Sequence, residues 1–414
     1  MSAAATQQKM VPELRFPGFL EPWEVKYLKD VATFRRGSFP QPYGLKKWYD
    51  PKNGLPFVQV FDVDDNFSLK KETKSRISKL AQPMSVFVPK GSVVITIQGS
   101  IGRIAITQYD AYVDRTLLIF KEMKQSFAKL FFVYSVYLCF EEEKRKAPGG
   151  TIKTITKEVL SSFTIPVPDV AEQQKIADFL GSVDAWLDNL RQQKTALETY
   201  KKGMMQKLFT QQVRFKDDEG NNFLEWDGGS LGDIATSVKG RGLSKEDIEE
   251  DGKNVCIRYA ELYTTYDEVI LSIASKTNHG IDGMVLSKEG DLLFPSSGET
   301  ALDIATFSCL MEEGVIMSGD LNAIRFNKEV HTPFFAYYLT NHLNREIAKY
   351  AQGNSVVHLY WSHFKRVDIK MPSLGEQKKI ADFLFTLDQS ISDKAAEIEK
   401  VEQWRKGLMQ KMFV

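Results

Sequence analysis

The sequence has few cysteines and no long apolar run. Its three cysteines, Cys139, Cys256 and Cys309, are scattered through 414 residues. An odd and scattered set argues against a disulfide framework or a zinc knuckle and suits a reducing compartment. The longest apolar stretch, residues 130–140, is far too short to span a bilayer, and the polar N-terminus lacks the apolar region of a signal peptide. These features predict a cytoplasmic protein without a membrane segment.

Catalytic signatures are also missing. There is no G-x-x-x-x-G-K-S/T phosphate loop and no H-E-x-x-H metal helix. The Asn-Pro-Pro-aromatic or Asp-Pro-Pro-aromatic motif of amino-methyltransferases is absent as well. All five histidines lie in the second half, and the pair His358 and His363 is more typical of packing or surface groups than of a metal site. We therefore predict no catalytic residue and no metal ligand in this chain.

Charge is balanced overall but unevenly distributed. The whole chain carries 54 Lys and Arg against 54 Asp and Glu. Residues 1–165 contain 25 basic and 16 acidic side chains, a net charge of +9, whereas residues 211–370 contain 16 and 25, a net charge of −9. The first region has the basic character expected of a nucleic-acid-binding domain. The second could bind DNA through a local basic strip, which the sequence does not show clearly.

The most informative feature is a sequence motif that occurs twice, AEQQKIADFL at 171–180 and GEQKKIADFL at 375–384, which we call the repeated phrase. Other matching segments follow in the same order at an offset of 203–204 residues. They include FFVY (131–134) with FFAY (334–337), and KKGMMQKLF (201–209) with RKGLMQKMF (405–413). Collinear matches of this kind indicate a tandem duplication. Because the sequence between them diverges, the pattern predicts a fixed frame that carries two different domains.

Each copy of the phrase begins a predicted long helix. A β-like run ending in proline precedes it, and Asp169 with Glu172, like Ser373 with Glu376, has the spacing of a capping box. Apolar residues then recur at steps of three and four for about five heptads, as in a coiled coil. Each helix of about 38 residues would be roughly 55–60 Å long. The predicted seam residues are Ile176, Leu180, Val183, Leu187, Leu190 and Leu197 in the first copy and Ile380, Leu384, Leu387, Ile391, Ile398 and Val401 in the second.

Two such seams pack most simply on each other as an antiparallel pair. The alternative is two amphipathic helices that each dock on their own domain. A chain of this length also favours more than one core. We predict an α+β fold in which two α/β domains are separated by two long antiparallel helices, with pseudo-twofold symmetry. The predicted boundaries are 1–168 for the first domain, 169–210 for the first helix, 211–372 for the second domain and 373–414 for the second helix.

The repeated phrase, together with the long helix that it begins in each copy, resembles the specificity subunit of type I restriction–modification enzymes. The resemblance is carried by the paired E-Q-x-K-I-A-x-x-L phrases, each after a proline-ended tract and a domain's length apart. VPELRFPGF (11–19) with the following tryptophan, and LFPSSGETALDIATF (293–307), are similar to segments of the same family. Without this resemblance, duplication and heptads support only a two-domain binding protein. Two rival interpretations remain. One is a coiled-coil adaptor that joins two non-DNA partners, and the other is an enzyme fused to a specificity module.

The resemblance implies a non-catalytic reader of DNA sequence. Each globular region would be a target recognition domain that reads one half of a split, asymmetric double-stranded target. The helix pair would set the spacing of the half-sites and dock two methyltransferase subunits. S-adenosylmethionine would bind in those subunits, and ATP with Mg²⁺ would bind in restriction and translocation subunits, so no cofactor is expected in this chain.

Arginine and lysine in glycine-rich turns are the predicted DNA contacts. A turn can enter a groove, and glycine allows the backbone to approach closely. The candidates are Arg35, Arg36, Gly99, Ser100, Arg103, Gly150 and Lys153 in the first half and Lys239, Arg241, Ser297, Gly298, Asn354 and His358 in the second. The alternative is that the glycines only shape turns and the charges are solvated. Tyr43, Trp48 and Trp361 could stack at a groove, although core packing is the commoner role of such residues.

Overall fold

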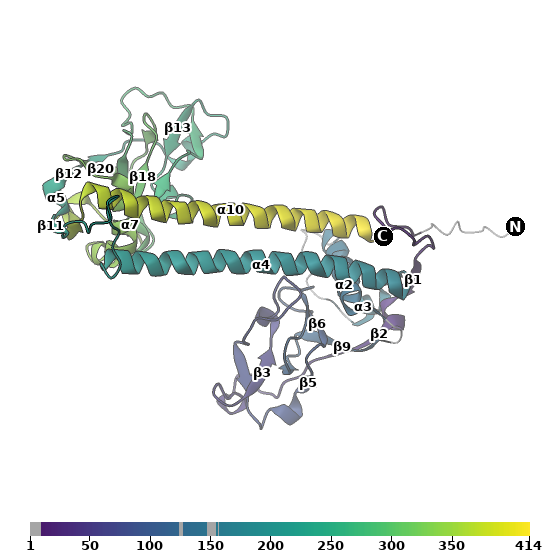
Figure 1. The fold of residues 1–414 in the computed structure, drawn as a ribbon. Helices are drawn as coiled ribbons and strands as arrows, with labels where there is room; N and C mark the ends of the chain where they lie inside the picture. Colours follow the sequence, from purple (N-terminus) through teal and green to yellow (C-terminus); the bar gives the residue numbers. More distant parts are fainter. Residues whose placement is uncertain (1–9, 124–126, 147–154, 156) are drawn as a thin grey trace. The chain divides into compact units, whose positions relative to one another are not determined.

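A computed structural model describes residues 10–123, 127–146, 155 and 157–414 (Figure 1). The chain forms two compact units. Unit 1 combines the chain up to Gln192 with Ala396–Val414, and unit 2 is Gln193–Ala395. Each unit therefore contains one half of each long helix, α4 (Val170–Phe209) and α10 (Leu374–Met412).

The two long helices pack together in antiparallel fashion, as predicted. In unit 1 the C-terminal half of α10 packs on the N-terminal half of α4, where Arg191 Nη2 lies 2.6 Å from Glu402 Oε1. In unit 2 the C-terminal half of α4 packs on the N-terminal half of α10, where Lys201 Nζ lies 2.5 Å from Asp388 Oδ1. The helices contain 40 and 39 residues, close to the length expected from the heptads.

The globular part of unit 1 is built on two four-stranded sheets, with strand orders β2-β9-β6-β7 and β4-β3-β8-β5. A separate antiparallel pair, β1 with β10, joins the start and end of this part. The strands are β1 (Glu24–Tyr27), β2 (Ala32–Arg36), β3 (Leu55–Val58), β4 (Ser75–Ile77), β5 (Val86–Val88), β6 (Val93–Thr96), β7 (Ile104–Ile106), β8 (Ala111–Val113), β9 (Leu117–Met123) and β10 (Thr164–Val167). The helices are α1 (Leu28–Val31), α2 (Lys129–Lys146) and α3 (Lys157–Ser162).

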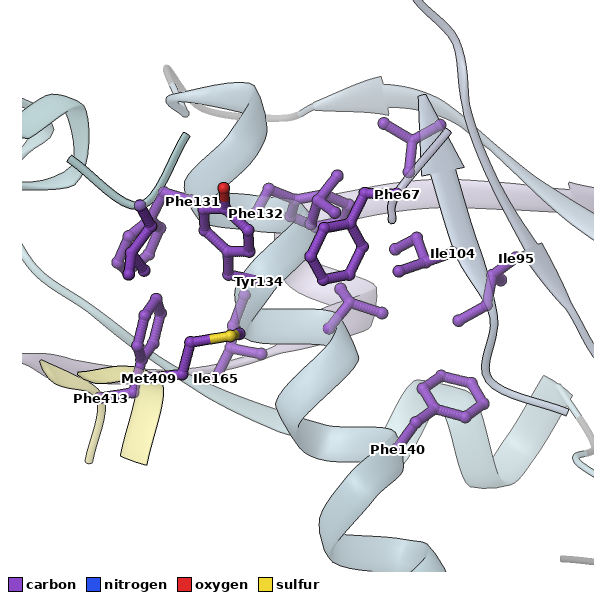
Figure 2. Close-up of a cluster of buried hydrophobic side chains, with 14 of the residues drawn as sticks. Phe67, Ile95, Ile104, Phe131, Phe132, Tyr134, Phe140, Ile165, Met409 and Phe413 are labelled. Atoms are coloured by element: carbon purple, nitrogen blue, oxygen red, sulfur yellow. The ribbon is translucent and has the colours of Figure 1, made fainter. Parts of the chain in front are cut away.

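The core of unit 1 surrounds α2, whose first half is apolar on every side and must therefore be buried. Figure 2 shows Phe131 and Tyr134 of α2 near Met409 of α10 and Phe413, which follows the end of α10. The ring of Phe131 stacks on that of Phe413 with centroids 5.2 Å apart. Phe67 contributes from the sheet region, with its ring edge-on to Tyr134. The last turn of the chain is thus part of the core of the first unit.

Unit 2 repeats this plan with different loops. Its largest sheet has the order β12-β20-β16-β18-β14, beside a three-stranded sheet β15-β13-β19 and the pairs β17-β21 and β11-β22. The strands are β11 (Asp227–Ser230), β12 (Ala235–Lys239), β13 (Asn254–Ile257), β14 (Val269–Ile270), β15 (Ser275–Thr277), β16 (Asp291–Pro295), β17 (Ser297–Gly298), β18 (Ser308–Leu310), β19 (Ile316–Met317), β20 (Leu321–Phe326), β21 (Val357–His358) and β22 (Asp368–Met371). The helices are α5 (Leu231–Ile234), α6 (Glu261–Thr264), α7 (Thr332–Tyr338), α8 (Asn344–Ala348) and α9 (Trp361–Phe364).

The duplication is visible in the strand register. Ala32 faces Met123 in the β2–β9 pair, and Ala235 faces Phe326 in the matching β12–β20 pair. Only glycine fits after β2 and after β12, because the backbone of a facing turn comes too close there to leave room for a Cβ atom. A Cβ on Gly37 would lie 2.3 Å from a carbonyl oxygen of the facing turn, and a Cβ on Gly240 would lie 2.1 Å from one. These two glycines belong to the frame that the two units share.

The predicted seam residues differ in burial along the helices. Those near the N-terminal ends pack into the cores of the globular parts, as Ile176 and Leu180 do beside α2 and Ile380 and Leu384 do in unit 2. The buried ones are Ile176, Leu180, Val183, Leu187, Leu190, Ile380, Leu384 and Val401. The half-buried ones are Leu197, Leu387, Ile391 and Ile398. The helices thus serve both as a pair and as part of each domain's core.

Candidate nucleic-acid interface

The repeated phrase fixes each globular part to its helix through a buried glutamate. In unit 1 the Glu172 carboxylate accepts hydrogen bonds from Arg15 Nε at 2.7 Å and Nη2 at 2.8 Å, and from Trp23 Nε1 at 3.2 Å. A buried carboxylate is stable only when it is paired in this way. The expected reciprocal capping box is therefore incomplete. Asp169 accepts the Glu172 N–H at 2.9 Å, but the glutamate side chain turns to Arg15 and Trp23 instead.

The second copy repeats these contacts with its own residues. Glu376 accepts from Arg214 Nε at 3.1 Å, from Arg214 Nη2 at 2.9 Å and from Trp226 Nε1 at 3.1 Å. The next residue of the phrase also has matching partners. Gln173 Nε2 donates to the Pro168 carbonyl, and Gln377 Nε2 donates to the Pro372 carbonyl, both at 2.9 Å. The phrase is therefore a structural anchor, and it leaves the loops of each globular part free to vary.

A second anchor joins each globular part to both long helices. The Tyr134 hydroxyl donates to Asp184 Oδ2 at 2.7 Å, and Arg405 of α10 also pairs with Asp184. In unit 2 the Tyr337 hydroxyl donates to Asp388 Oδ2 at 2.6 Å. Burial is the largest cause that raises the pKa of each tyrosine and of each aspartate. Both hydroxyls therefore keep their protons and act as donors near neutral pH.

Four predicted DNA-contact residues lie together in unit 2. Ser297 Oγ lies 3.0 Å from His358 Nδ1, although 61 positions separate the two residues. The same hydroxyl donates to Asp320 Oδ2 at 3.1 Å, and Lys239 Nζ approaches Asp320 Oδ1 at 3.7 Å. The fourth residue, Gly298, pairs with the strand of His358. The cluster contains hydroxyl, imidazole, carboxylate and ammonium groups within one small region, in which Ser297 and Gly298 are buried.

The remaining predicted residues of unit 2 flank this cluster. Arg241 is exposed, and its backbone N–H donates to the Met317 carbonyl just before the turn that contains Asp320. Asn354 is exposed at the tip of a loop closed by two backbone hydrogen bonds between Gln352 and His358. Short polar side chains at a loop tip are suited to enter a groove. The fold thus brings segments near residues 239, 297 and 320 to one end of the sheet, beside the strand of His358.

The predicted residues of unit 1 have different surroundings. Arg35 and Arg36 are exposed at the end of β2. Gly99 has a left-handed φ of 68° in the exposed turn after β6, which Ser100 shares. The guanidinium of Arg103 is bound within the domain, with Nε 2.9 Å from Asp65 Oδ1. Gly150 and Lys153 lie outside the described residues.

The sequence reasoning missed a polar cluster in unit 1. The Tyr43 hydroxyl donates to Asp114 Oδ2 at 3.2 Å and accepts from Gln59 Nε2 at 2.5 Å. The Arg115 guanidinium carbon lies 5.6 Å from the centre of the Tyr43 ring. Burial, followed by the charge of Asp114, raises the pKa of the Tyr43 phenol, so it remains protonated. One sequence signal for this cluster is the triplet Asp114-Arg115-Thr116 before β9. It takes the place of Ser318-Gly319-Asp320 before β20 in the second repeat.

The other two aromatic candidates pack in the interior or partly so. Trp48 is buried, with Lys47 Nζ 4.4 Å from its ring centre. Trp361 is half-buried against Phe364, with ring centroids 5.5 Å apart. Among the described residues there is no group of three His, Cys, Asp or Glu side chains placed to hold a metal ion. The described helices include none that is long and apolar enough to cross a membrane.

Comparison with known proteins places both repeats in one family. The model of the family described as "Type I restriction modification DNA specificity domain" matches residues 20–199 and again residues 224–403. Two relatives from Methanocaldococcus jannaschii are similar along the chain. The type I restriction enzyme MjaVIII specificity subunit is 23% identical, over 96% of this chain and 92% of the relative. The putative type I restriction enzyme MjaX specificity subunit is 25% identical, over 94% and 92%.

Two solved structures share the fold. The S subunit of a type I restriction–modification system from M. genitalium superposes with a TM-score of 0.61, at 17% identity, over 98% of this chain and 99% of that one. A chain from a study of assembly and conformational transition of the type I R-M system superposes with a TM-score of 0.56, at 15% identity, over 97% and 99%. The likeness therefore extends over both globular parts and both long helices.

Proposed function

The chain belongs to the family of type I restriction modification DNA specificity domain proteins as a non-catalytic specificity subunit with two recognition domains, and on this premise we propose that each domain reads one half of a split, asymmetric DNA target. The proposal rests on one observation. The two units share internal contacts that hold their folds, but they differ in the side chains of their exposed loops. Both units keep the same glutamate anchor and the same glycine, which follows β2 in unit 1 and β12 in unit 2. Their exposed loops carry different side chains, so the two half-sites should differ in sequence.

The helix pair would fix the distance between the half-sites. A helix of 40 residues is about 60 Å long, and two helices paired along their length bend little. The anchors at Glu172 and Glu376 tie each recognition domain to the beginning of one helix. The length of the helices, rather than any loop, would then determine the number of base pairs between the half-sites.

We also propose that two methyltransferase subunits dock on the frame, one at each repeat. The support is an exposed aromatic ladder that occurs in both units. In unit 1 Phe179 of α4 contacts Phe16 and Trp404, with centroids 5.8 and 6.3 Å away. In unit 2 Phe383 of α10 contacts Phe215 and Tyr200, with centroids 5.7 and 6.4 Å away.

The ladders present apolar surface to solvent. Trp404 is 47% exposed and Tyr200 is 50% exposed, and the nearby Leu20 and Leu224 are 85% and 82% exposed. Large exposed aromatic and leucine side chains are typical of protein interfaces. Because the two ladders are built at matching positions, two copies of the same partner would bind them.

The catalytic chemistry would lie in the partner subunits. S-adenosylmethionine would bind in the methyltransferase subunits, and restriction and translocation subunits would use ATP and Mg²⁺. The assembled complex would act in the cytoplasm, where its DNA substrate is located. Methyltransferase subunits on both sides could also supply the positive charge that the acidic second domain lacks, which would close the DNA into a basic channel.

Sequencing of modified bases in cells that produce the full chain with its methyltransferase tests the proposed function. We expect methylation at a target of two short, different half-sites separated by a fixed number of unspecified bases. An adaptor that joins non-DNA partners would leave the genomic methylation pattern unchanged when the chain is deleted. Methylation at a continuous site would reject the two-reader arrangement.

A further inference from the structure

The turn that precedes β9 presents one arginine at its tip. The Leu117 N–H donates to the Asp114 carbonyl at 3.0 Å, which closes a four-residue turn with Arg115 and Thr116 in the middle. Asp114 is buried, and its Oδ1 accepts from the Thr116 N–H at 3.0 Å and from the Thr116 hydroxyl at 2.6 Å. The carboxylate thus fixes the turn from inside, while Arg115 is exposed.

The matching turn of unit 2 makes the same backbone hydrogen bonds but carries an opposite charge, and Asp320 in it has a left-handed φ of 60°. There the Leu321 N–H donates to the Ser318 carbonyl at 3.3 Å. Both turns are tied to the neighbouring sheet in the same way, by Asp114 N–H to the Val58 carbonyl and by Ser318 N–H to the Ile257 carbonyl, each at 3.0 Å. The tip residues, however, are Gly319 and Asp320 in place of an arginine and a threonine. The hydrogen bonds of the turn are thus shared while its charge differs, so these hydrogen bonds do not require an arginine.

Arg115 is also held in a defined orientation. Its guanidinium carbon lies 5.6 Å from the ring centre of Tyr43, within the range of a cation–π contact. Tyr43 itself is fixed by hydrogen bonds to Asp114 and Gln59. Within the described part of the chain, Arg115 makes no ion pair, in contrast to Arg103, which is bound to Asp65. The N–H groups at the edge of the Arg115 fork are therefore available to a ligand.

We propose that Arg115 is a specificity-determining residue, which reads the acceptor edge of a guanine in the half-site bound by the first recognition domain. The planar fork of arginine matches O6 and N7 of guanine in the major groove, and the cation–π contact with Tyr43 restricts the positions of the guanidinium. This inference rests on the proposed function of the chain as a DNA reader. It adds a residue outside the basic glycine-rich turns, in a cluster whose aromatic member is only 40% exposed.

Two substitutions and one control test this role in the full chain, assembled with its methyltransferase. R115A removes the fork, and R115K keeps the positive charge without the fork. R145A is the matched control, because Arg145 is an exposed arginine on α2 of the same unit. Binding is measured with a duplex that carries the methylated site of the unaltered complex and with a random duplex, at several salt concentrations, and modified bases are mapped in cells.

For R115A and R115K we expect target affinity to fall about tenfold or more, with little change on random duplex. The methylation map should relax at one position of one half-site, while the other half-site and the spacing persist. R145A should leave both readouts unchanged. Equal losses on both duplexes, or wild-type behaviour of R115K, would identify a phosphate contact and overturn the proposal. An unchanged map in R115A would overturn it too.

Failure of this inference is distinguishable from failure of the proposed function. If the unaltered complex methylates no split target, the function itself is wrong. If the unaltered complex methylates a split target and R115A does so identically, only the role of Arg115 is wrong. Should R115A lower the melting temperature, R115K decides the outcome, because it preserves the charge over Tyr43.

Discussion

Tyr134 of α2 donates its hydroxyl hydrogen to Asp184 of α4 at 2.7 Å, and Tyr337 makes the same bond to Asp388 at 2.6 Å in the other unit. Each aspartate also pairs with a cation from the opposite long helix, Arg405 or Lys201. One buried carboxylate therefore links a globular part to both helices of the frame. The duplication has preserved this linkage, although the cation differs between the copies.

Replacing Tyr134 with phenylalanine should destabilise unit 1 by about 1–3 kcal/mol, because a buried hydrogen bond to a charged group is lost. Thermal unfolding of the full chain measures this effect. The control is Tyr27→Phe, which removes a hydroxyl from a tyrosine that is 49% exposed in the same unit. Equal effects of the two substitutions would contradict the anchoring role of Tyr134.

Replacing Phe413 with alanine should destabilise the first recognition domain by about 3 kcal/mol, although the residue is next to last in the chain. Its ring stacks on Phe131 and lies edge-on to Trp23. Hydrogen exchange should show faster exchange in α2 and unchanged exchange in α7. Val414→Ala is the control, since that side chain is 44% exposed. A uniform effect across both units would be inconsistent with this packing.

Leu187→Asp should prevent stable assembly of the frame, because it buries a charge at a position that is 3% exposed. We expect a loss of several kcal/mol of stability, or loss of the methyltransferase complex on size-exclusion chromatography. Ala185→Asp places the same charge on an exposed position of the same helix. If Leu187→Asp assembles as well as Ala185→Asp, the helix-pair account is in difficulty.

Acidification should weaken unit 2 more than unit 1. Burial lowers the pKa of His342, and burial is also the largest cause that lowers the pKa of His331. Such a histidine stays neutral in the folded state while the unfolded chain takes up a proton. Its stabilising contribution is therefore present above the ordinary value of 6.5 and is lost as the pH falls through it.

Hydrogen exchange at pH 7.5 and at pH 5.5 measures the difference between the units. All five histidines lie in the second half of the sequence. Opening of unit 2 should become easier at the lower pH, and His342→Gln should reduce that change. A larger response in unit 1 would show that other groups dominate the titration.

The regular features of the fold were predictable from sequence. Heptad spacing and the repeated phrase predicted two long antiparallel helices, because the spacing of apolar residues and the repeat of a motif can be read directly from the sequence. The role of Glu172 was not predictable in this way. Its partner Arg15 lies 157 positions away, and the spacing to Asp169 suggested a capping box instead. Contacts of this range depend on the folded topology and leave no periodic signal.

The candidate interface was predictable only in part. Glycine-rich basic turns led to Ser297 and His358, which the fold brings to 3.0 Å from each other. Arg115 lies between two strands in a segment without glycine, so the pattern of glycine-rich basic turns does not include it. The fold reveals its place, because its turn makes the same backbone hydrogen bonds as the turn at 318–321. Which of these residues touch bases stays a prediction.

An exchange of one recognition domain tests the central claim most directly. β1 pairs with β10 so that Glu24 faces Val167, and the first domain therefore joins the frame at two neighbouring points. Residues 24–167 can be replaced with the corresponding segment of a related specificity subunit, and modified bases can be mapped in cells. Two independent readers on a fixed frame predict that one half-site changes while the other half-site and the spacing remain. A change in both half-sites, or in the spacing, would contradict the account.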